Sequence, residues 1–210
     1  MAPIDSSTLA FAATILVNSR GAKTLPVFTK DGANVAWQLE TPLEVTFEPS
    51  AYNDPENTST RVTMCLTPSD AVRDQVAALD EWCIRTLAAN PVPLIGVQLT
   101  MDQIHDRYVS CMKNNEKGYS TLCLKMNRCG RYALQCFTPE REKRAFPNAW
   151  RGTSVRAQIT CRGPFLMGRD FGPVLVNIIR PARRSSDLSC RSDAYHGSDP
   201  RPLCVMYEKQ

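Results

Sequence analysis

The sequence predicts a mainly β chain of the α+β class, a barrel or sandwich with one inserted helix. Short apolar runs rich in β-branched or alternating residues recur along it, separated by turn-forming segments. One segment alone has a sustained helical period of apolar residues. Fifteen prolines and ten glycines among 210 residues disfavour a helical bundle. A chain of this length also buries enough surface to fold without disulfides or metal.

Before residue 67 the apolar runs predict only strands. The dipeptide Asp31-Gly32 lies between two of them and suits a tight hairpin. The stretch 49–60 is polar and rich in turn-forming residues, which predicts an exposed loop. The predicted strands are Leu9–Val17, Leu25–Thr29, Val35–Leu39, Leu43–Phe47 and Arg61–Leu66.

A long helix is predicted over about residues 68–90. Thr67 suits the N-cap and Pro68 the first helical position, whereas Pro91 prevents the helix from continuing. The helix is expected to cover an open face or end of the sheet with the apolar residues of one side. These are Val72, Val76, Leu79, Cys83 and Leu87. A short helix is predicted within 99–114.

Further strands follow the helices. Alternation places Cys123 and Lys125 outward on the first of them, and Arg156 outward on a later one. The predicted strands are Ser120–Met126, Arg131–Phe137, Ser154–Cys161, Pro164–Met167 and Val174–Ile179. Strand-rich segments around one capped helix favour an OB-fold-like five-stranded barrel with extra N-terminal strands.

The chain is expected to form a single OB-like β-barrel domain over residues 1–181. Residues 182–210 are polar and predict a flexible C-terminal tail. No apolar run approaches the length of a membrane span, and the run Leu9–Val17 follows Asp5 rather than the basic stretch of a secretory signal. We therefore expect a protein that is not secreted and has no membrane partner.

The cysteines predict free thiols rather than a metal centre. Their number, nine, is odd, and none of the spacings is the C-x2-4-C of a zinc site. Most lie in apolar runs, where a thiol behaves as a small core residue. Free thiols indicate a reducing intracellular compartment, such as the nucleus, the cytoplasm or a viral factory.

Charge is unevenly distributed along the chain. Residues 1–100 contain six Lys or Arg against eleven Asp or Glu, whereas residues 101–210 contain nineteen against ten. Aromatic residues are interleaved with the basic ones in the second half. Cations that neutralise phosphates and rings that stack on unpaired bases are the components of a nucleic-acid surface.

Motifs of catalysis are absent from the sequence. It contains no P-loop, no Rossmann glycine fingerprint, no H-E-x-x-H and no G-x-S-x-G. We therefore predict no catalytic residue, no cofactor and no metal, and a protein that is not an enzyme.

Two blocks in the second half carry a family resemblance. Gly118–Met126 ends in a lysine-bearing strand, and Trp150–Cys161 is followed by Pro164–Gly172 and the closing strand Val174–Ile179. In spacing and residue type this third of the chain resembles the OB-fold single-stranded DNA-binding proteins of large eukaryotic DNA viruses, and more distantly the podophage single-strand-binding type. The resemblance implies a late strand that leads through a glycine hairpin into the last strand of an OB barrel.

Two features depart from that family pattern. Phage members of this type typically end in an acidic tail, whereas this chain ends Tyr207–Gln210. Related viral proteins often have an aromatic residue in the closing strand, where this chain has Val174 and Leu175. The resemblance therefore does not extend to the acidic tail through which phage members contact partner proteins.

The leading hypothesis is a non-catalytic protein that binds single-stranded DNA and protects or organises it during replication, recombination or repair. RNA, replication proteins and further copies of the chain are additional candidate partners. Phosphate contacts are predicted for Lys117, Lys125, Arg128, Arg131, Arg151, Arg156, Arg162 and Arg169, and base stacking for Tyr119, Tyr132, Trp150 and Phe165. For Trp150, anchoring of the loop that enters its strand is an equal alternative.

Two other functions fit the same charge pattern. The acidic first half and basic second half suit a protein-interaction or structural β-module, such as a virion or scaffold component that associates head to tail. An RNA-binding module is the third candidate, because stacking and phosphate contacts do not identify the sugar.

Overall fold

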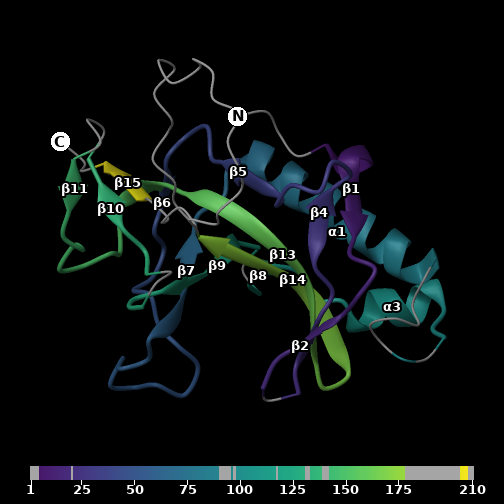
Figure 1. Cartoon of the computed structure of the whole chain (residues 1–210). Helices are drawn as coiled ribbons and strands as arrows, with labels where there is room; N and C mark the ends of the chain where they lie inside the picture. The colour runs from purple at the N-terminus through teal and green to yellow at the C-terminus, as the bar shows by residue number, and fades with distance from the viewer. Residues whose placement is uncertain are drawn as a thin grey trace, which may run out of the picture.

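Strands dominate the computed structural model, which describes residues 5–19, 21–89, 96, 98–116, 118–130, 133–138, 142–177 and 204–207 (Figure 1). Its helical elements are the 3-10 turn η1 (Ser6–Thr8) and the α-helices α1 (Asp70–Ala89) and α3 (Met101–Arg107). The first strands are β1 (Leu9–Phe11), β2 (Leu16–Val17), β3 (Lys23–Thr24), β4 (Val27–Thr29), β5 (Ala36–Gln38), β6 (Leu43–Glu44) and β7 (Arg61–Leu66). After the helices come β8 (Met112–Asn114), β9 (Ser120–Asn127), β10 (Cys136–Phe137), β11 (Lys143–Arg144), β12 (Ser154–Arg156), β13 (Gln158–Met167), β14 (Asp170–Asn177) and β15 (Cys204–Tyr207). The predicted α+β class, mainly β, is confirmed.

The long helix agrees with its predicted range but begins two residues later. Its first turn is capped by Ser69, whose hydroxyl accepts a hydrogen bond from the amide of Val72 at 3.4 Å. Thr67, the predicted N-cap, instead contacts the hydroxyl of Thr46 at 3.1 Å. The short helix α3 begins at a capping box, in which Thr100 and Gln103 each bond the other's backbone amide.

A ring of strands forms the centre of the fold. Strand β13 pairs with β14, β14 runs parallel to β9, and β9 pairs with β7. The segment 36–50 then lies between two neighbours: β5 and β6 pair with β13 and β12, while Val45 and Ser50 bridge to β7. The described hydrogen-bonded sheets do not form a fully closed barrel. Because β12 leads directly into β13, however, the strand neighbours run around the barrel from β13 through β14, β9, β7 and the segment 36–50 back to β12 and β13.

This arrangement is the partly open five-stranded Greek-key barrel of the OB-fold. Along the chain, its first to fifth barrel strands are the segment 36–50, β7, β9, β12 with β13, and β14. The helix α1 connects the second and third barrel strands. The predicted extra N-terminal strands are present, but Leu9–Val17 is not one strand: its ends form β1, which pairs with β4, and β2, which pairs with β3.

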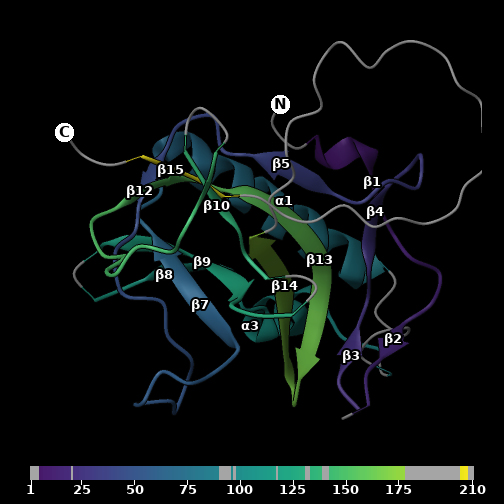
Figure 2. The same ribbon diagram turned by 60° about the vertical axis from the view of Figure 1, so that its left-hand side comes forward.

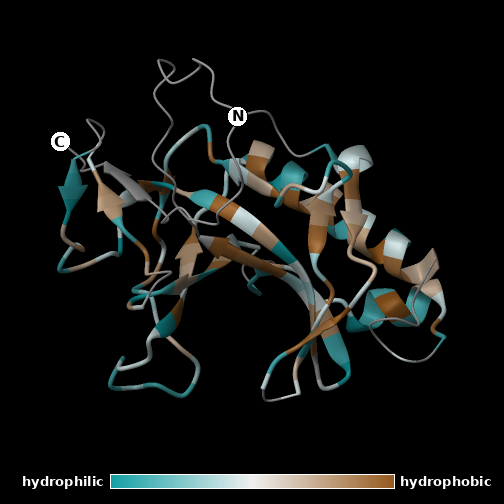
Figure 3. Ribbon diagram, in the orientation of Figure 1, coloured by the Kyte–Doolittle hydropathy of each residue, from teal (hydrophilic) through white to brown (hydrophobic). Residues whose placement is uncertain are grey.

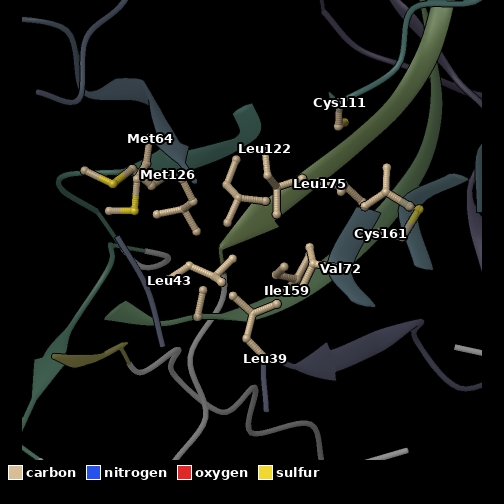
Figure 4. Close-up of a cluster of buried hydrophobic side chains, with 14 of the residues drawn as sticks. Leu39, Leu43, Met64, Val72, Cys111, Leu122, Met126, Ile159, Cys161 and Leu175 are labelled. Atoms are coloured by element: carbon tan, nitrogen blue, oxygen red, sulfur yellow. The ribbon is translucent and has the colours of Figure 1, made fainter. Parts of the chain in front are cut away.

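The interior of the barrel and the inner side of α1 share one hydrophobic core. Alternate residues of the barrel strands are fully buried, among them Met64, Leu122 and Ile159. Figure 4 shows Val72 of α1 beside Ile159 and Leu39. Burying one large apolar side chain stabilises the fold by roughly 1.5–3 kcal/mol, so the alternation fixes which side of each strand faces solvent.

A second hydrophobic cluster holds α3 against the end of the barrel. It joins Ile84 and Leu87 of α1 to Ile104 and Phe171. The amide of Val109 donates to the Phe171 carbonyl at 2.8 Å, and a Cβ at position 172 would stand 1.9 Å from the Val109 carbonyl oxygen. Glycine is therefore required where β14 passes the segment that follows α3.

The last described strand lies within the predicted tail. β15 pairs with β10 and β12 in a five-stranded sheet. The rest of the predicted tail, 182–203 and 208–210, lies outside the described residues. Among the described residues, no helix has the length and apolar character needed to cross a membrane.

Candidate nucleic-acid interface

The sides of β7 and β9 that point away from the core form one polar, cationic surface. Buried and accessible residues alternate along both strands, as the two-residue period of a strand requires. The accessible positions are Arg61, Thr63 and Cys65 on β7 and Thr121, Cys123, Lys125 and Asn127 on β9. We call this surface the β7–β9 outer face. None of its positions is acidic.

Cross-strand register sets the positions of the lysines at this surface. Lys125 lies opposite Thr63, and its ammonium group donates to the Thr63 hydroxyl at 2.7 Å. Lys113 on β8 lies opposite Thr121 and is also exposed. Residues directly opposite one another share a face of the sheet, so Lys113 extends the β7–β9 outer face at its β8 edge.

Two arginines from distant parts of the chain interact electrostatically beside this surface. Arg61 is the first residue of β7, and Arg162 is an exposed residue of β13. The pKa of Arg61 is lowered, first by partial burial of its guanidinium group and then by repulsion from Arg162. A phosphate between the two groups would relieve this repulsion and form charge-assisted hydrogen bonds.

Two loops flank the β7–β9 outer face. The 49–60 loop joins the first and second barrel strands, and the turn at 168–169 joins the fourth and fifth. Both extend toward the same side of the molecule (Figures 1 and 2), and the 49–60 loop is largely hydrophilic (Figure 3). Tyr52 in the first loop is 94% exposed, and the Arg169 side chain in the turn is 86% exposed. Each loop therefore presents one large side chain to solvent beside the cationic strands.

The 49–60 loop is held in shape by Arg128 and Asp54. The Arg128 guanidinium donates to the carbonyl of Asn57 at 2.7 Å and to that of Pro49 at 3.1 Å. The Asp54 carboxylate accepts the amide of Ser59 at 2.7 Å, and such bonds lower its pKa to about 2. Arg128 was predicted to contact phosphate; its hydrogen bonds give it a role in positioning the loop.

Of the residues predicted from the sequence, Lys125 belongs to the β7–β9 outer face, and Arg169 lies on the adjoining turn. Arg162 is an exposed residue of β13 whose charge acts on Arg61. Tyr119 is 69% exposed and directly precedes β9, where its amide bonds the side chain of Asn115 at 2.9 Å. Its ring is therefore available for stacking at the start of a strand of this surface.

Trp150 and Arg151 occupy a different place. Trp150 is 6% exposed, and its ring centroid lies 5.6 Å from that of Phe146, so it offers no free surface to a base. Glu48 accepts the amides of Trp150 and Arg151 at 2.9 and 2.8 Å. The stacking prediction for Trp150 is not supported. These contacts fit the alternative prediction, that Trp150 anchors the loop leading into β12.

Two further predicted residues lie away from this surface. Arg156 points out of the core, as its alternation predicted, but it belongs to β12, which the segment 36–50 separates from β7. Phe165 is half-buried in β13 between Thr24 of β3 and Gly172 of β14. The remaining predicted residues, Lys117, Arg131 and Tyr132, lie outside the described residues.

Sequence reasoning missed Arg61, Lys113 and Tyr52 as site residues. Arg61 and Tyr52 belong to the half of the chain with a net negative charge, whereas the predicted site residues all lie in the basic half. The position of Arg61 at the start of an alternating strand predicts only that its side chain faces solvent. Its proximity to Lys125 becomes evident only from the pairing of β7 with β9.

Several titratable groups away from this surface are buried. Asp80 of α1 accepts the hydroxyls of Tyr108 and Ser110 at 2.7 and 2.5 Å, and burial raises its pKa. Burial likewise raises the pKa of the Cys83, Cys111 and Cys161 thiols. Among the described residues, no three His, Cys, Asp or Glu side chains are grouped so as to hold a metal ion.

No protein-family model matches the sequence, and no curated protein matches it significantly. Among solved structures, the single-stranded DNA-binding protein of bacteriophage Enc34 in complex with ssDNA is similar at a TM-score of 0.46 and 10% identity, over 94% of this chain and 96% of that chain. A single-stranded DNA-binding protein encoded by bacteriophage T7 is similar at a TM-score of 0.36 and 12% identity, over 79% of this chain and 100% of that chain. Because these TM-scores lie below 0.5, the fold assignment rests on the strand pairings described above.

Proposed function

We propose that this chain binds single-stranded DNA without catalysing a reaction on it, through the β7–β9 outer face and its two flanking loops. The observation that carries the proposal is the convergence of cations from four different strands on one side of the barrel. They are Arg61, Lys113, Lys125 and Arg162. In OB-folds generally, the second and third barrel strands and these two loops form the surface that takes oligonucleotides.

The chemistry of this surface suits an unpaired strand. Its cations would neutralise successive phosphates and release their counterions, so binding should weaken linearly on a logarithmic scale of salt concentration. Tyr52 and Tyr119 offer exposed rings at its margins, and stacking on one base is worth roughly 1–3 kcal/mol. Neither interaction depends on sequence, so little preference between oligonucleotide sequences is expected.

Asp54 and Glu56 lie in the 49–60 loop, but several other acidic residues of the first half lie on α1. Exposed carboxylates of α1 include Asp70, Asp74 and Glu81, whereas the opposite side of the same helix packs on the core. A DNA strand would thus be attracted to the barrel strands and repelled by the helix. We further propose that residues 1–181 act as one binding unit and that the protein protects or organises single-stranded DNA during replication, recombination or repair.

Fluorescence anisotropy with a labelled oligo(dT) across a salt series tests the proposal. Lys125→Glu should weaken binding by more than tenfold near 0.1 M salt, because one lost phosphate contact costs about fivefold there and the reversed charge adds repulsion. Arg85→Glu makes the same change of charge on the exposed side of α1 and should change affinity less than twofold. Equal effects of the two variants, or no binding at low salt, would overturn the proposal.

Two additional measurements address the other candidate functions. An oligo(U) of equal length, titrated in the same way, distinguishes RNA from DNA, because discrimination requires a contact to the 2′-hydroxyl. Light scattering without nucleic acid tests for head-to-tail association. Association that Lys125→Glu abolishes, in a protein that does not bind DNA, would favour the protein-interaction module.

A further inference from the structure

Two cysteines lie side by side on the β7–β9 outer face. Cys65 of β7 is the direct cross-strand partner of Cys123 of β9, and their sulfur atoms are 3.6 Å apart. Both side chains are half-buried, so a small solute has access to them from solvent. They come from positions 58 residues apart in the sequence and are brought together only by the pairing of the two strands.

The backbone around the pair has the geometry that favours a cross-strand link. The amide of Cys123 donates to the Cys111 carbonyl at 2.9 Å, on the side away from β7. The carbonyl of Cys65 accepts the amide of Thr46 at 2.8 Å, on the side away from β9. The two cysteines are therefore a non-hydrogen-bonded pair, in which the Cα atoms of antiparallel strands come to about 4.5 Å. Disulfides span Cα separations from about 4.4 Å upward, so a bond needs little movement of the strands.

The surroundings of the pair favour reaction at Cys123. A hydrogen bond from Cys65, followed by one from Thr121 and by the charges of Lys113 and Lys125, lowers the pKa of the Cys123 thiol. The thiolate is the reactive form of cysteine toward oxidants. Of the other thiols with a described environment, Cys83, Cys111, Cys136 and Cys161 are buried and Cys129 alone is exposed.

We propose that Cys65 and Cys123 form a reversible disulfide between β7 and β9, with a hydroperoxide as the oxidant. The Cys123 thiolate attacks one oxygen of hydrogen peroxide, the O–O bond breaks, and hydroxide leaves and is protonated to water, which gives a sulfenic acid. The Cys65 sulfur then attacks the Cys123 sulfur, and the hydroxyl leaves as a second water with the Cys65 proton. Two thiols and one peroxide thus give one disulfide and two waters. A low-molecular-weight thiol reverses the bond by exchange.

The pair also reports on occupancy of this surface, and this part of the inference rests on the proposed function. On β7, Cys65 is the next outward residue after Thr63, and on β9, Cys123 is the outward residue before Lys125. Both cysteines therefore lie within the surface assigned to DNA. A bound oligonucleotide should cover both sulfur atoms and slow their oxidation. The chemistry of the pair itself does not require DNA.

The test uses the reduced full chain, a small excess of hydrogen peroxide, alkylation of the remaining thiols and mass spectrometry after non-reducing digestion. We expect loss of two thiols and a peptide that links Cys65 to Cys123, reversed by dithiothreitol. Cys65→Ser should leave Cys123 as a sulfenic acid that dimedone traps, and the control Cys129→Ser should behave as the wild type. Absence of the link, or a link from Cys123 to Cys111 or to a second chain, would overturn the proposal.

Repeating the oxidation with saturating oligo(dT) separates the two proposals. We expect oligo(dT) to slow oxidation at least fivefold in the wild type and by a clearly smaller factor in Lys125→Glu at the same concentrations. A disulfide that forms in a protein with no measurable DNA binding would support the cysteine pair and refute the proposed function. Tight DNA binding without protection would place DNA on another surface and refute the assignment of the pair to the interface.

Discussion

Replacing Arg61 or Arg162 by Gln removes one of two guanidinium groups that repel each other, so stability and DNA binding should change in opposite directions. In the wild type the pKa of Arg61 is lowered first by partial burial and then by the charge of Arg162, and each substitution removes this second effect. For exposed charges the gain in the free energy of unfolding is small, about 0.5 kcal/mol or less, because water screens them. Urea denaturation should therefore show equal or slightly higher stability for either variant.

The loss of DNA affinity follows from counterion release. One phosphate contact to a single strand contributes about 0.7 to the slope of log K against log salt concentration, which corresponds to about fivefold in affinity at 0.1 M salt. Each single substitution should therefore weaken binding about fivefold and lower the slope by about 0.7. The double variant should lose about 25-fold if the arginines hold separate phosphates, and nearer fivefold if they share one.

Fluorescence anisotropy with oligo(dT) over a salt series, measured for the two single variants and the double variant, gives all of these values. An unchanged affinity and slope in both single variants would refute the placement of these arginines in the interface. If affinity falls and the variants are also destabilised by several kcal/mol, the arginines act on DNA binding through folding, and repulsion between them is not their main effect on stability.

Two further predictions concern the loops that border the barrel. Glu48→Ala removes the acceptor of the Trp150 amide and should lower the free energy of unfolding, measured by urea denaturation, by about 1–2 kcal/mol. Tryptophan fluorescence should change as well, whereas Glu56→Ala in the exposed loop should have neither effect. Equal urea midpoints for Glu48→Ala and the wild type would contradict the anchoring role. In the folded protein the pKa of Asp54 is about 2, below its unfolded value. The stabilisation of the loop by its carboxylate is therefore complete above the unfolded pKa and is lost as the pH falls toward 2. The NMR shift of the Ser59 amide should titrate near pH 2 and lose this transition in Asp54→Asn; a midpoint near 4 would refute the hydrogen bond.

Local patterns in the sequence predicted the parts of the fold that depend on local physics. The outward positions of Cys123 and Lys125 followed from the two-residue period of β9, and the range of α1 followed from its apolar spacing and the proline after it. These features are fixed by a few neighbouring residues. The solvent-facing side of β9 and the outward position of Arg156 on β12 were therefore predictable without knowledge of the partner strands.

The composition of the candidate site depends on contacts between distant segments, which local patterns do not contain. Arg156 was correctly predicted to face outward, yet its strand lies beyond the first barrel strand from β7. Arg61 was missed because its contribution requires the pairing of β7 with β9, and the pairing of Cys65 with Cys123 was missed for the same reason. Trp150 was ambiguous because burial of an aromatic ring is decided by tertiary packing.

The first barrel strand has a consequence for how copies of the protein behave when crowded. Its bridges at Val45 and Ser50 occupy backbone groups of β7 that would otherwise form a long open edge. The described outer strands β2, β6, β8 and β11 contain only two or three residues each. Such short edges give a neighbouring molecule few amides and carbonyls to pair with. The described edges therefore disfavour the fusion of neighbouring molecules into continuous β-structure.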